Sequence, residues 1–393
     1  MPFEELFVPP QIAAATGDGA WVQAMVDFEV ALARAQGLPE LDVPPLDPVE
    51  IARAGRSSGN PAAALVSALD SPDAHRGATS QDVMDTAAML VARRTLPLID
   101  AELSGVAAAC AALARDHRDT PMVARTLLQQ ALPTTFGLKA AGWLLGIDEA
   151  RELLAAVPLQ VELGGAAGTL AALGEDGLAV LGRLAAELEL EEPVLPWHTR
   201  RVRVAQLGAA LAIAAGALEK IALDLKLMAQ TEVGEVAESG EGGRGGSSTL
   251  PHKRNPVGSA LTIACAAGVR GAASVLTGAL AQEHERAAGA WQAEWEALSR
   301  ALALTGGAAA SLREALEGLE VFPDRMRANL DLTGGLIMTE ALVLRLGRAE
   351  AKRVAEEAAR SGRPLTEAPD PTTYLGSAGA LVDRALKAHE EGR

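Results

Sequence analysis

One stretch decides the fold: residues 207–228 read LGAALAIAAGALEKIALDLKLM. Apolar residues recur there at alternating steps of four and three positions, at Leu207, Leu211, Ala214, Leu218, Ile221, Leu225 and Met228. This spacing places them in one stripe along a helix that packs nearly parallel to its neighbours. At 1.5 Å per residue the stripe is about 30 Å long, so the sequence predicts a long helix within a bundle.

Three further long helices are predicted, two before this segment in the sequence and one after it. The first starts near Asp82, has a kink at Pro97 and carries an apolar stripe at Ile99, Leu103, Val106, Cys110 and Leu113. The second, residues 133–157, opens with a proline, and the third, residues 255–286, opens with Asn-Pro. Asparagine is a frequent N-cap, and proline is favoured at the first helical position because its missing N–H has no intrahelical partner there.

The composition favours an ordered helical protein. Apolar residues make up 49% of the chain and charged residues 22%, whereas aromatic residues make up only 3%. The abundance of alanine and leucine favours close-packed helices over strands. The net charge of −16 argues against nucleic acid or an anionic membrane as a partner.

The sequence also predicts a cytoplasmic protein. The start of the chain, MPFEELF, has neither the basic nor the apolar region of a signal peptide. The longest apolar run, residues 204–218, is interrupted by Gln206 and Gly208 and is too short to span a bilayer. Cys110 and Cys265 lie within apolar helical patterns, with no disulfide or metal spacing, which is typical of a reducing compartment.

We predict an all-α fold with three parts. Residues 1–80 are expected to form a small N-terminal cap of short, proline-punctuated helices, and residues 81–322 a central bundle of long helices. Residues 323–393 are expected to form a short C-terminal helical cap. Small residues on several helix faces allow close approach between copies of the chain, so the bundle is expected to bury faces against other subunits.

Residues 242–257, GGRGGSSTLPHKRNPV, predict an anion-binding loop. Four glycines allow its backbone to approach a ligand closely, Ser247 and its neighbour offer hydroxyls, and Lys253 and Arg254 offer positive charge. The loop leads into a helix start, where free N–H groups favour anions. A flexible linker is the alternative, but linkers rarely combine a serine pair, cations and a capped helix start.

A second segment, HRGATSQDVMDT at residues 75–86, predicts a carboxylate cradle. Thr79 and Ser80 precede Asp82 at a helix start, where hydroxyls and free backbone N–H groups can hold a carboxylate. The alternative is an ordinary N-cap formed by Thr79 or Ser80.

Two further segments are polar but less specific. RTLLQQALPTTFG, residues 125–137, surrounds a proline with polar side chains, and a polar turn between helices explains it as well as a binding site does. In PWHTRRVR, residues 196–203, His198 is either a ligand contact or a capping residue. The arginines after it are more simply explained as a solvated face.

Taken together, these segments resemble the fumarase/aspartase superfamily. The loop is similar to the superfamily's signature S-S-x-M-P-x-K-x-N-P, with Leu250 in place of the usual methionine, and the segments around Thr79 and Thr126 match its other two conserved regions in order. Within the superfamily, the chain most resembles the 3-carboxy-cis,cis-muconate cycloisomerases. That similarity is carried by VQAMVDFEVALARA (22–35), GATSQDVMDT (77–86), RTLLQQALPTTFGLKAAGW (125–143), LPWHT (195–199) and YLGSAGALVDRAL (374–386).

The resemblance implies an all-helical homotetramer in which three subunits share each active site, with no cofactor and no metal. It implies lactonisation of 3-carboxy-cis,cis-muconate to 4-carboxymuconolactone, in the protocatechuate branch of the β-ketoadipate pathway. The alternative is a lyase on the same scaffold that eliminates a group from a succinate derivative to give fumarate. A scaffold retained as a binding protein without turnover is a third interpretation, and the intact Ser247, Lys253 and Asn255 argue against it.

The resemblance also assigns roles to individual residues. Ser247 takes the place of the catalytic base or acid of the loop, and His75 is a candidate acid. The candidates for binding a small polycarboxylate substrate are Thr79, Ser80, Thr126, Gln129, His198, Arg201, Lys253 and Asn255. Leu127 stands where many lyases of the superfamily have a catalytic histidine, as it does in the muconate enzymes. This argues against adenylosuccinate and argininosuccinate lyase activity.

Overall fold

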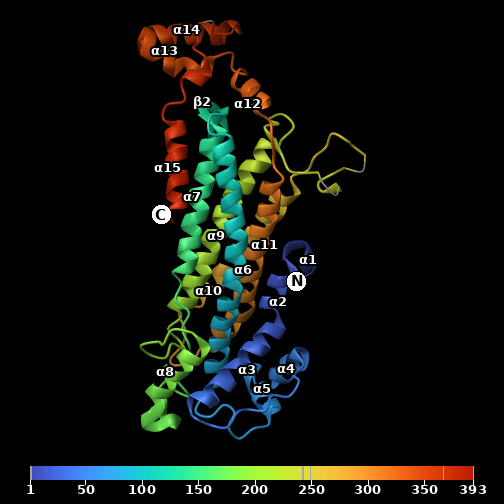
Figure 1. The fold of residues 1–393 in the computed structure, drawn as a ribbon, viewed down its shortest axis with the longest axis vertical. Coiled ribbons are helices and arrows are strands. Elements are labelled where there is room, and N and C mark those ends of the chain that lie inside the picture. The colour runs from blue at the N-terminus through green and yellow to red at the C-terminus, as the bar shows by residue number, and fades with distance from the viewer. Residues whose placement is uncertain (1, 241–242, 248, 366, 393) are drawn as a thin grey trace. The chain divides into compact units, whose positions relative to one another are not determined.

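Helices dominate the protein, and the predicted all-α class is confirmed (Figure 1). The structure is a computed structural model that describes residues 2–240, 243–247, 249–365 and 367–392. Five helices of 20 or more residues lie in this described part: α6 (Ser80–Asp116), α7 (Phe136–Ala155), α9 (Val202–Met228), α10 (Val257–Gly278) and α11 (Ala290–Glu317).

The stripe that predicted α9 is its buried side. All seven of its apolar residues are at most 4% exposed, and α9 covers the whole of the predicted segment. The stripe residues of α6 are buried from Ile99 to Cys110, but the predicted Leu113 is only partly buried, and the neighbouring Ala114 is buried instead. A straight helix advances by 3.6 residues per turn, so a strict heptad stripe drifts off its buried face after a few turns.

Contacts divide the chain into two compact units, and each unit contains a part of every long helix. The first unit consists of Met1–Glu102, Ala150–Gly216 and Ala264–Ala310. The second consists of Leu103–Glu149, Ala217–Ile263 and Ser311–Arg393. Because this division cuts across the long helices, the domain boundaries after residues 80 and 322 stay a prediction.

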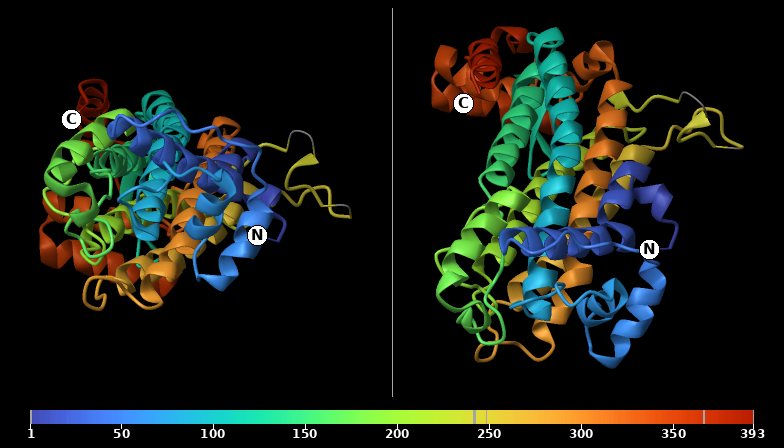
Figure 2. Two further views of the ribbon diagram at one scale, coloured as in Figure 1. Left: turned by 90° about the horizontal axis from the view of Figure 1, so that it is seen from below. Right: turned by 60° about the horizontal axis from the view of Figure 1, so that its bottom comes forward.

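The first unit surrounds its part of the bundle with short helices (Figure 2). α3 packs against α2, α4, α5 and α8. The bounds of these helices, with the first helix of the chain, are α1 (Glu4–Phe7), α2 (Pro10–Thr16), α3 (Asp18–Ala35), α4 (Pro48–Ala54), α5 (Ala62–Leu69) and α8 (Gly177–Leu188).

The second unit adds two short strand pairs and the C-terminal helices. β1 (Pro121–Thr126) pairs antiparallel with β2 (Gln129–Thr135), and β3 (Val236–Ala237) pairs with β4 (Glu320–Val321). α12 packs against β1, and α13 against α14. The C-terminal helices are α12 (Pro323–Leu330), α13 (Thr339–Leu346), α14 (Arg348–Ser361) and α15 (Ala378–Glu390).

The prediction that a helix starts at Pro133 is wrong. Pro133 lies in β2, opposite Val123 of β1, and α7 starts only at Phe136. Thr135 caps α7, since its Oγ1 accepts a hydrogen bond from a backbone N–H of the first turn at 3.1 Å. Proline fits both a first helical turn and a two-stranded ribbon, because at either place its missing N–H has no obligatory partner.

The prediction that the following helix continues to about Arg286 is also wrong. α10 ends at Gly278, and residues 279–289 connect it to α11 without helix. Within this connection the backbone of Ala281 forms an isolated bridge with that of Arg200. The pairing places Arg286 in a loop of the first unit, which proves important for the site.

Length and composition alone would allow three helices, α6, α9 and α10, to cross a membrane. This contradicts the expectation that no apolar stretch is long enough. Of the most apolar window in each helix, 33%, 56% and 39% respectively is buried within the chain. Much of each apolar surface therefore faces outward in a single copy of the protein.

Candidate active site

The predicted site residues fall into two groups, one in each unit. His75, Thr79, Ser80, His198 and Arg201 belong to the first unit. Thr126, Gln129, Ser247, Lys253 and Asn255 belong to the second.

His75 is held by a buried carboxylate. Its Nδ1 lies 2.8 Å from Oε1 of Glu29 on α3, and its backbone N–H donates to Oε2 at 2.6 Å. Because a carboxylate accepts, Nδ1 carries the hydrogen and Nε2 is left with a lone pair. The His75 side chain is 22% exposed, so Nε2 can exchange a proton with a molecule outside the fold.

Thr79 stands at the N-terminus of α6, as predicted, and Asp82 closes the turn. The backbone N–H of Thr79 donates to Asp82 Oδ2 at 2.8 Å, and the N–H of Asp82 donates to the Thr79 carbonyl at 3.0 Å. The first bond is one half of a capping box, in which the side chain of the third helical residue accepts from the N-cap N–H; the other half is absent, because the Thr79 carbonyl and not its hydroxyl accepts from Asp82. The spacing T-S-Q-D, residues 79–82, is a capping signal in the sequence, so the role of Asp82 could have been found there.

Asp82 is the centre of the cradle although it was not predicted as a site residue. It is fully buried, and its carboxylate also accepts from the backbone N–H groups of Gly164 (2.9 Å) and Gly165 (3.0 Å) and lies 2.6 Å from His198 Nε2. These contacts join three separate segments of the chain. They leave the hydroxyl of Thr79 and the start of α6 facing outward.

Arg286 brings a cation to the cradle. Its Nη1 donates to Thr79 Oγ1 at 2.9 Å, and its Nη2 donates to the carbonyl of Ala166 at 3.3 Å. Its Nε is buried with no hydrogen-bond partner in the described part of the chain. Arg286 therefore has a spare donor beside a helix N-terminus, an arrangement that suits a carboxylate. No local sequence pattern identifies Arg286 as a site residue. It lies in a loop, whereas the sequence predicted a helix up to about this position.

His198 is buried, with only 4% of its side chain exposed, and it contacts acidic residues. Besides Asp82, its Nε2 lies 3.6 Å from Oε1 of the fully buried Glu162. Burial, followed by the nearby charges of Asp82 and Asp85, raises the pKa of Glu162 well above its usual value and so favours its neutral form. His198 is thus a buried residue that holds Asp82 in position, and it does not line the outer surface of the cradle.

Arg201 is also buried, so the interpretation of the arginines as a solvated face is wrong for this residue, whereas Arg200 is exposed. Its guanidinium donates to both oxygens of Asp85, at 2.6 and 3.0 Å, and to Glu294, where Nε lies 3.1 Å from Oε1. Burial lowers the pKa of Arg201, but the two carboxylates outweigh it and raise that pKa. Burial also raises the pKa of Glu294, to about 6, against the opposing effect of Arg201.

One potential ligand atom from each of Asp82, Glu162 and His198 lies within 4.8 Å of the others, close enough to bind one metal ion. Their donors do not fit one. Both oxygens of Asp82 already accept from backbone N–H groups, and Nε2 of His198 lies 2.6 Å from the same carboxylate, whereas a metal needs ligand atoms with free lone pairs. The cluster is better described as structural.

In the second unit, Thr126 and Gln129 face each other at the end of the β1–β2 hairpin. Both are exposed. The two residues between them, Leu127 and Leu128, have φ values of 50° and 65°, in the left-handed region, and their side chains are 97% and 74% exposed. Two-residue turns of this kind favour Asn-Gly, so a leucine pair is strained here and presents an apolar tip.

The hairpin is attached to the rest of the second unit through the buried carboxylate of Glu235. Arg125 donates to both oxygens of the fully buried Glu235, at 2.9 and 2.7 Å. Asn329 of α12 donates to the same carboxylate at 2.8 Å, and its carbonyl accepts from Gln130 at 3.1 Å. The hairpin tip is therefore held on a rigid base.

The loop of residues 239–256 is closed at its base by Asn255, which we expected to be a helix N-cap. Both the backbone N–H and the side-chain amide of Asn255 donate to the carbonyl of Gly245, each at 2.8 Å. Gly245 has φ 67°, and a Cβ there would lie 2.3 Å from the Asn255 carbonyl oxygen, so only glycine fits. The cap of α10 is instead Glu238, whose carboxylate accepts from two N–H groups of the first turn at 2.8 Å each.

Ser247 and Lys253 line a cavity of about 930 Å³ beside this loop. Ser247 Oγ accepts from the backbone N–H of Leu250 at 3.1 Å, which would favour its anionic form. Arg244 and Arg254 also line the cavity but are paired with Glu314 and Glu320.

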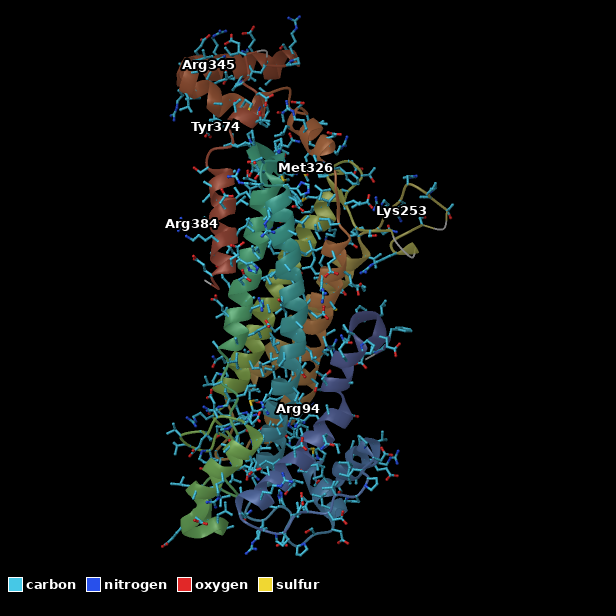
Figure 3. All side chains as sticks on the ribbon, viewed as in Figure 1. Arg94, Lys253, Met326, Arg345, Tyr374 and Arg384 are labelled. Carbon is cyan, nitrogen blue, oxygen red and sulfur yellow. The ribbon has the colours of Figure 1, made fainter. Side chains whose placement is uncertain are left out.

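Lys253 has no ion-pair partner in the part of the chain that the structure describes, and it is exposed. Figure 3 places it on the loop, away from the helices. It is therefore the cation of this cavity that is best able to meet a substrate carboxylate.

Comparisons with known proteins agree with this arrangement. The profile of a family described as lyase matches residues 66–271. The chain is 47% identical to nitrosuccinate lyase of Streptomyces davaonensis, over 95% of this chain and 92% of that protein. It is 43% identical to 3-carboxy-cis,cis-muconate cycloisomerase of Bradyrhizobium diazoefficiens, over 96% and 95%. The crystal structure of 3-carboxy-cis,cis-muconate lactonizing enzyme from Pseudomonas putida superimposes with a TM-score of 0.90 at 39% identity, covering 99% of each chain.

Proposed function

The chain belongs to the lyase family of the fumarase/aspartase superfamily, and from this premise we propose that it lactonises 3-carboxy-cis,cis-muconate to 4-carboxymuconolactone. The observation that carries the proposal is the near full-length likeness to enzymes of that name in both sequence and structure. The anion-binding groups of both units support it, since the substrate carries three carboxylates.

The proposed reaction needs carboxylate binding and one proton transfer. An oxygen of a substrate carboxylate forms the C–O bond of the lactone as one π bond breaks, and the carbon next to another carboxylate takes a proton. Ser247 transfers this proton, and water then reprotonates the enzyme. His75 is the second group able to do so, because Glu29 fixes its Nδ1 hydrogen and leaves Nε2 free to act.

The negative charge that develops on the substrate must be held in place. Thr79, Ser80 and Arg286 are proposed to bind one carboxylate at the start of α6, and Lys253 to bind another from the loop. Thr126 and Gln129 would contact the substrate from the hairpin tip, whereas His198 and Arg201 would act through the residues they position. No cofactor takes part in these steps.

We propose that the protein is a homotetramer in which three subunits complete each site. The exposure of Thr126 and Gln129, and the strained leucines between them, support a tip that another subunit covers. The outward apolar surface of α9 and α10 supports burial between copies, with Ile213, Leu223 and Val275 all more than a third exposed. A cytoplasmic location, without nucleic acid or membrane as a partner, stays a prediction.

A second candidate is elimination from a substituted succinate. The relative named nitrosuccinate lyase, at 47% identity, specifically favours it. Loss of nitrite from nitrosuccinate leaves fumarate, and the proton removed comes from a carbon next to a carboxylate. The same groups would therefore act, with Ser247 as the base instead of the acid.

One pair of assays separates the two candidates. The conjugated diene of 3-carboxymuconate absorbs in the ultraviolet, and lactonisation removes this absorbance. Nitrosuccinate turnover releases nitrite and fumarate, which are measured separately. Turnover of the muconate that Ser247→Ala abolishes would support the cycloisomerase. Nitrite release without loss of diene absorbance would replace it with the lyase.

A further inference from the structure

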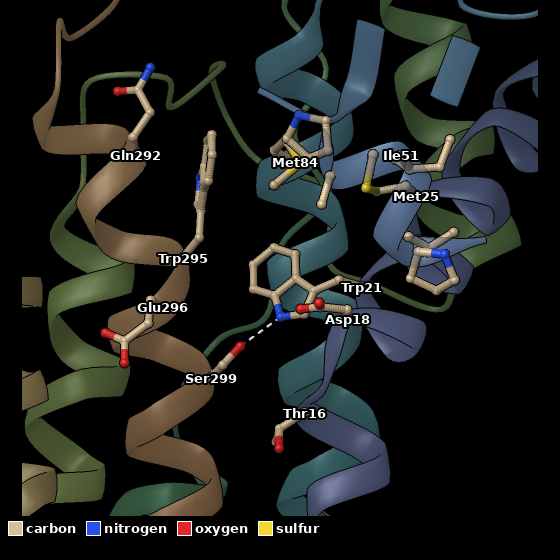
Figure 4. Close-up of a pocket in the computed structure, with 14 residues that line it drawn as sticks. Thr16, Asp18, Trp21, Met25, Ile51, Met84, Gln292, Trp295, Glu296 and Ser299 are labelled. Atoms are coloured by element: carbon tan, nitrogen blue, oxygen red, sulfur yellow. Dashed lines mark hydrogen bonds between the residues drawn. The ribbon is translucent and has the colours of Figure 1, made fainter. Parts of the chain in front are cut away.

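A second cavity in the first unit contains none of the predicted site residues. It has a volume of about 340 Å³ and lies between α3, α4, α6 and α11 (Figure 4). This volume falls at the lower end of the range for small-molecule sites in proteins. The residues that line the cavity all belong to the first unit.

The walls of this cavity are aromatic and apolar. Trp21 of α3 and Trp295 of α11 provide two indoles, and the buried Met25 and Met84 provide soft thioether surface (Figure 4). The chain has only five tryptophans, so two of them in one cavity is a strong local enrichment. Indole faces and thioethers suit a flat apolar body.

The geometry of the walls is fixed by hydrogen bonds and ring packing. Trp21 Nε1 donates to Ser299 Oγ at 2.6 Å, which joins α3 to α11 across the cavity. Trp295 packs edge to face against Trp291, with ring centroids 4.9 Å apart. Trp291 in turn donates to the buried Asp85 at 3.0 Å. The indoles are therefore preorganised and do not have to collapse into the space between them.

The acidic lining of this cavity disfavours binding of the proposed polycarboxylate substrate. Asp18 and Glu296 are its ionisable residues, and both are exposed at the edge of the cavity. Glu296 Oε1 also lies 3.6 Å from Nη1 of Arg300, one turn further along α11. The described lining contains no lysine or arginine, and the chain as a whole carries a net charge of −16. A polycarboxylate would be repelled here. A cation would be attracted by Asp18 and by the faces of the indoles, and more weakly by Glu296, because Arg300 offsets part of its charge.

We propose that this cavity binds a small organic cation that has an aromatic or apolar body. The body lies against the two indoles and the methionines, and the ammonium group lies toward Asp18 and Glu296. The ligand class thus differs in charge from the proposed substrate of the same protein. The site is independent of Ser247 and of the reaction assigned to it.

Three probes of similar shape and different charge test the proposal on the full-length protein. They are 2-phenylethylamine, 2-phenylethanol and 3-phenylpropionate, each titrated by calorimetry and by tryptophan fluorescence. We expect the amine to bind about tenfold more tightly than the alcohol, from two weak carboxylate contacts and the cation–π contribution. The carboxylate is expected to show no binding over the same range. Equal affinity for all three probes, or no binding of the amine, would overturn the proposal.

Two variants locate the binding. Asp18→Asn with Glu296→Gln is expected to reduce the affinity for the amine about tenfold and to leave the alcohol unaffected. Ala52→Trp, on the exposed side of α4, is expected to fill the cavity and to abolish binding of both probes.

A matched control is Glu350→Gln with Glu357→Gln on α14. It changes the net charge by the same amount at a distant exposed place, so it should bind the amine like the wild type. If the control weakened amine binding as much as the cavity variant did, the attraction would be a property of the total charge, and the proposal would be wrong. Unchanged amine binding in Ala52→Trp would equally exclude this cavity.

Discussion

The cradle in the first unit and the loop and hairpin in the second differ in how their polar groups are satisfied. Around Asp82, a fully buried carboxylate contacts three backbone N–H groups and His198. In the second unit, Thr126, Gln129 and Lys253 are exposed, and the anchoring bonds lie beneath them at Glu235 and Glu238. The carboxylate at the centre of the cradle is thus satisfied by contacts within one chain, whereas the side chains of the second group are exposed. The two kinds of region should respond differently to substitution.

The largest effect is expected at Ser247, on activity alone. Ser247→Ala should lower kcat by about 10²- to 10⁴-fold, because it removes the group proposed to transfer the proton. The melting temperature should not change, since within the described residues the hydroxyl accepts from backbone N–H groups of its own loop, at Thr249 and Leu250. Ser361→Ala, an exposed serine of α14, is the control and should alter neither quantity. A shift in melting temperature as large as that of a core variant would show that the two regions do not differ as described.

Asp82 should show the opposite behaviour. Asp82→Ala leaves three N–H groups without an acceptor in a buried place, which should lower the free energy of unfolding by about 3–5 kcal/mol. Asp82→Asn keeps one acceptor oxygen and should cost less. Urea unfolding measures both, with Asp383→Asn as a surface control that should show no measurable change. Unfolding curves that coincide with that of the wild type would mean that the cradle is not rigidly held.

A smaller and pH-dependent effect is expected from Glu162. Burial, with Asp82 and Asp85, raises the pKa of Glu162 in the folded state above its usual 4.5. The folded protein therefore binds more protons than the unfolded chain above about pH 4.5, and stability falls as pH rises toward the folded-state pKa. The loss is at most about 1.4 kcal/mol per pH unit.

Glu162→Gln imitates the neutral carboxyl and should remove this loss. Relative to the wild type, the variant should become progressively more stable as pH rises above about 4.5, as measured by urea unfolding. His198, Asp82, Asp85 and Arg201 remain in both proteins, so the difference isolates Glu162. Parallel pH profiles would show that this carboxyl is ionised in the fold.

The smallest effect is expected at the hairpin tip, and it should be a gain in stability. Leu127→Asn with Leu128→Gly supplies residues that accept positive φ, and should raise the free energy of unfolding by about 1–2 kcal/mol. If the tip contacts the substrate, KM should rise at the same time. A stabilised variant with unchanged KM would remove the hairpin tip from the site.

The sequence predicted those parts of the molecule that depend on local periodicity. The stripe from Leu207 to Met228 predicted α9 because burial of one helix face leaves a regular pattern. Pro133 led to a wrong prediction of a helix start, since proline fits the first turn of a helix and a two-stranded ribbon equally well. Arg286 could not have been predicted, because it meets Thr79 across 207 positions and no spacing rule reports such a contact.

The closure of the loop by Asn255 and Gly245 makes that loop a separable module. Asn255 is joined to the carbonyl of Gly245 by a main-chain and a side-chain bond, so we expect residues 246–254 to be exchangeable without altering where α10 begins. Grafting this segment from a relative of different specificity would transfer its chemistry while the helices stay as they are. Diversification of the family could proceed by the same route, through short insertions and replacements in a segment whose attachment points are already paired.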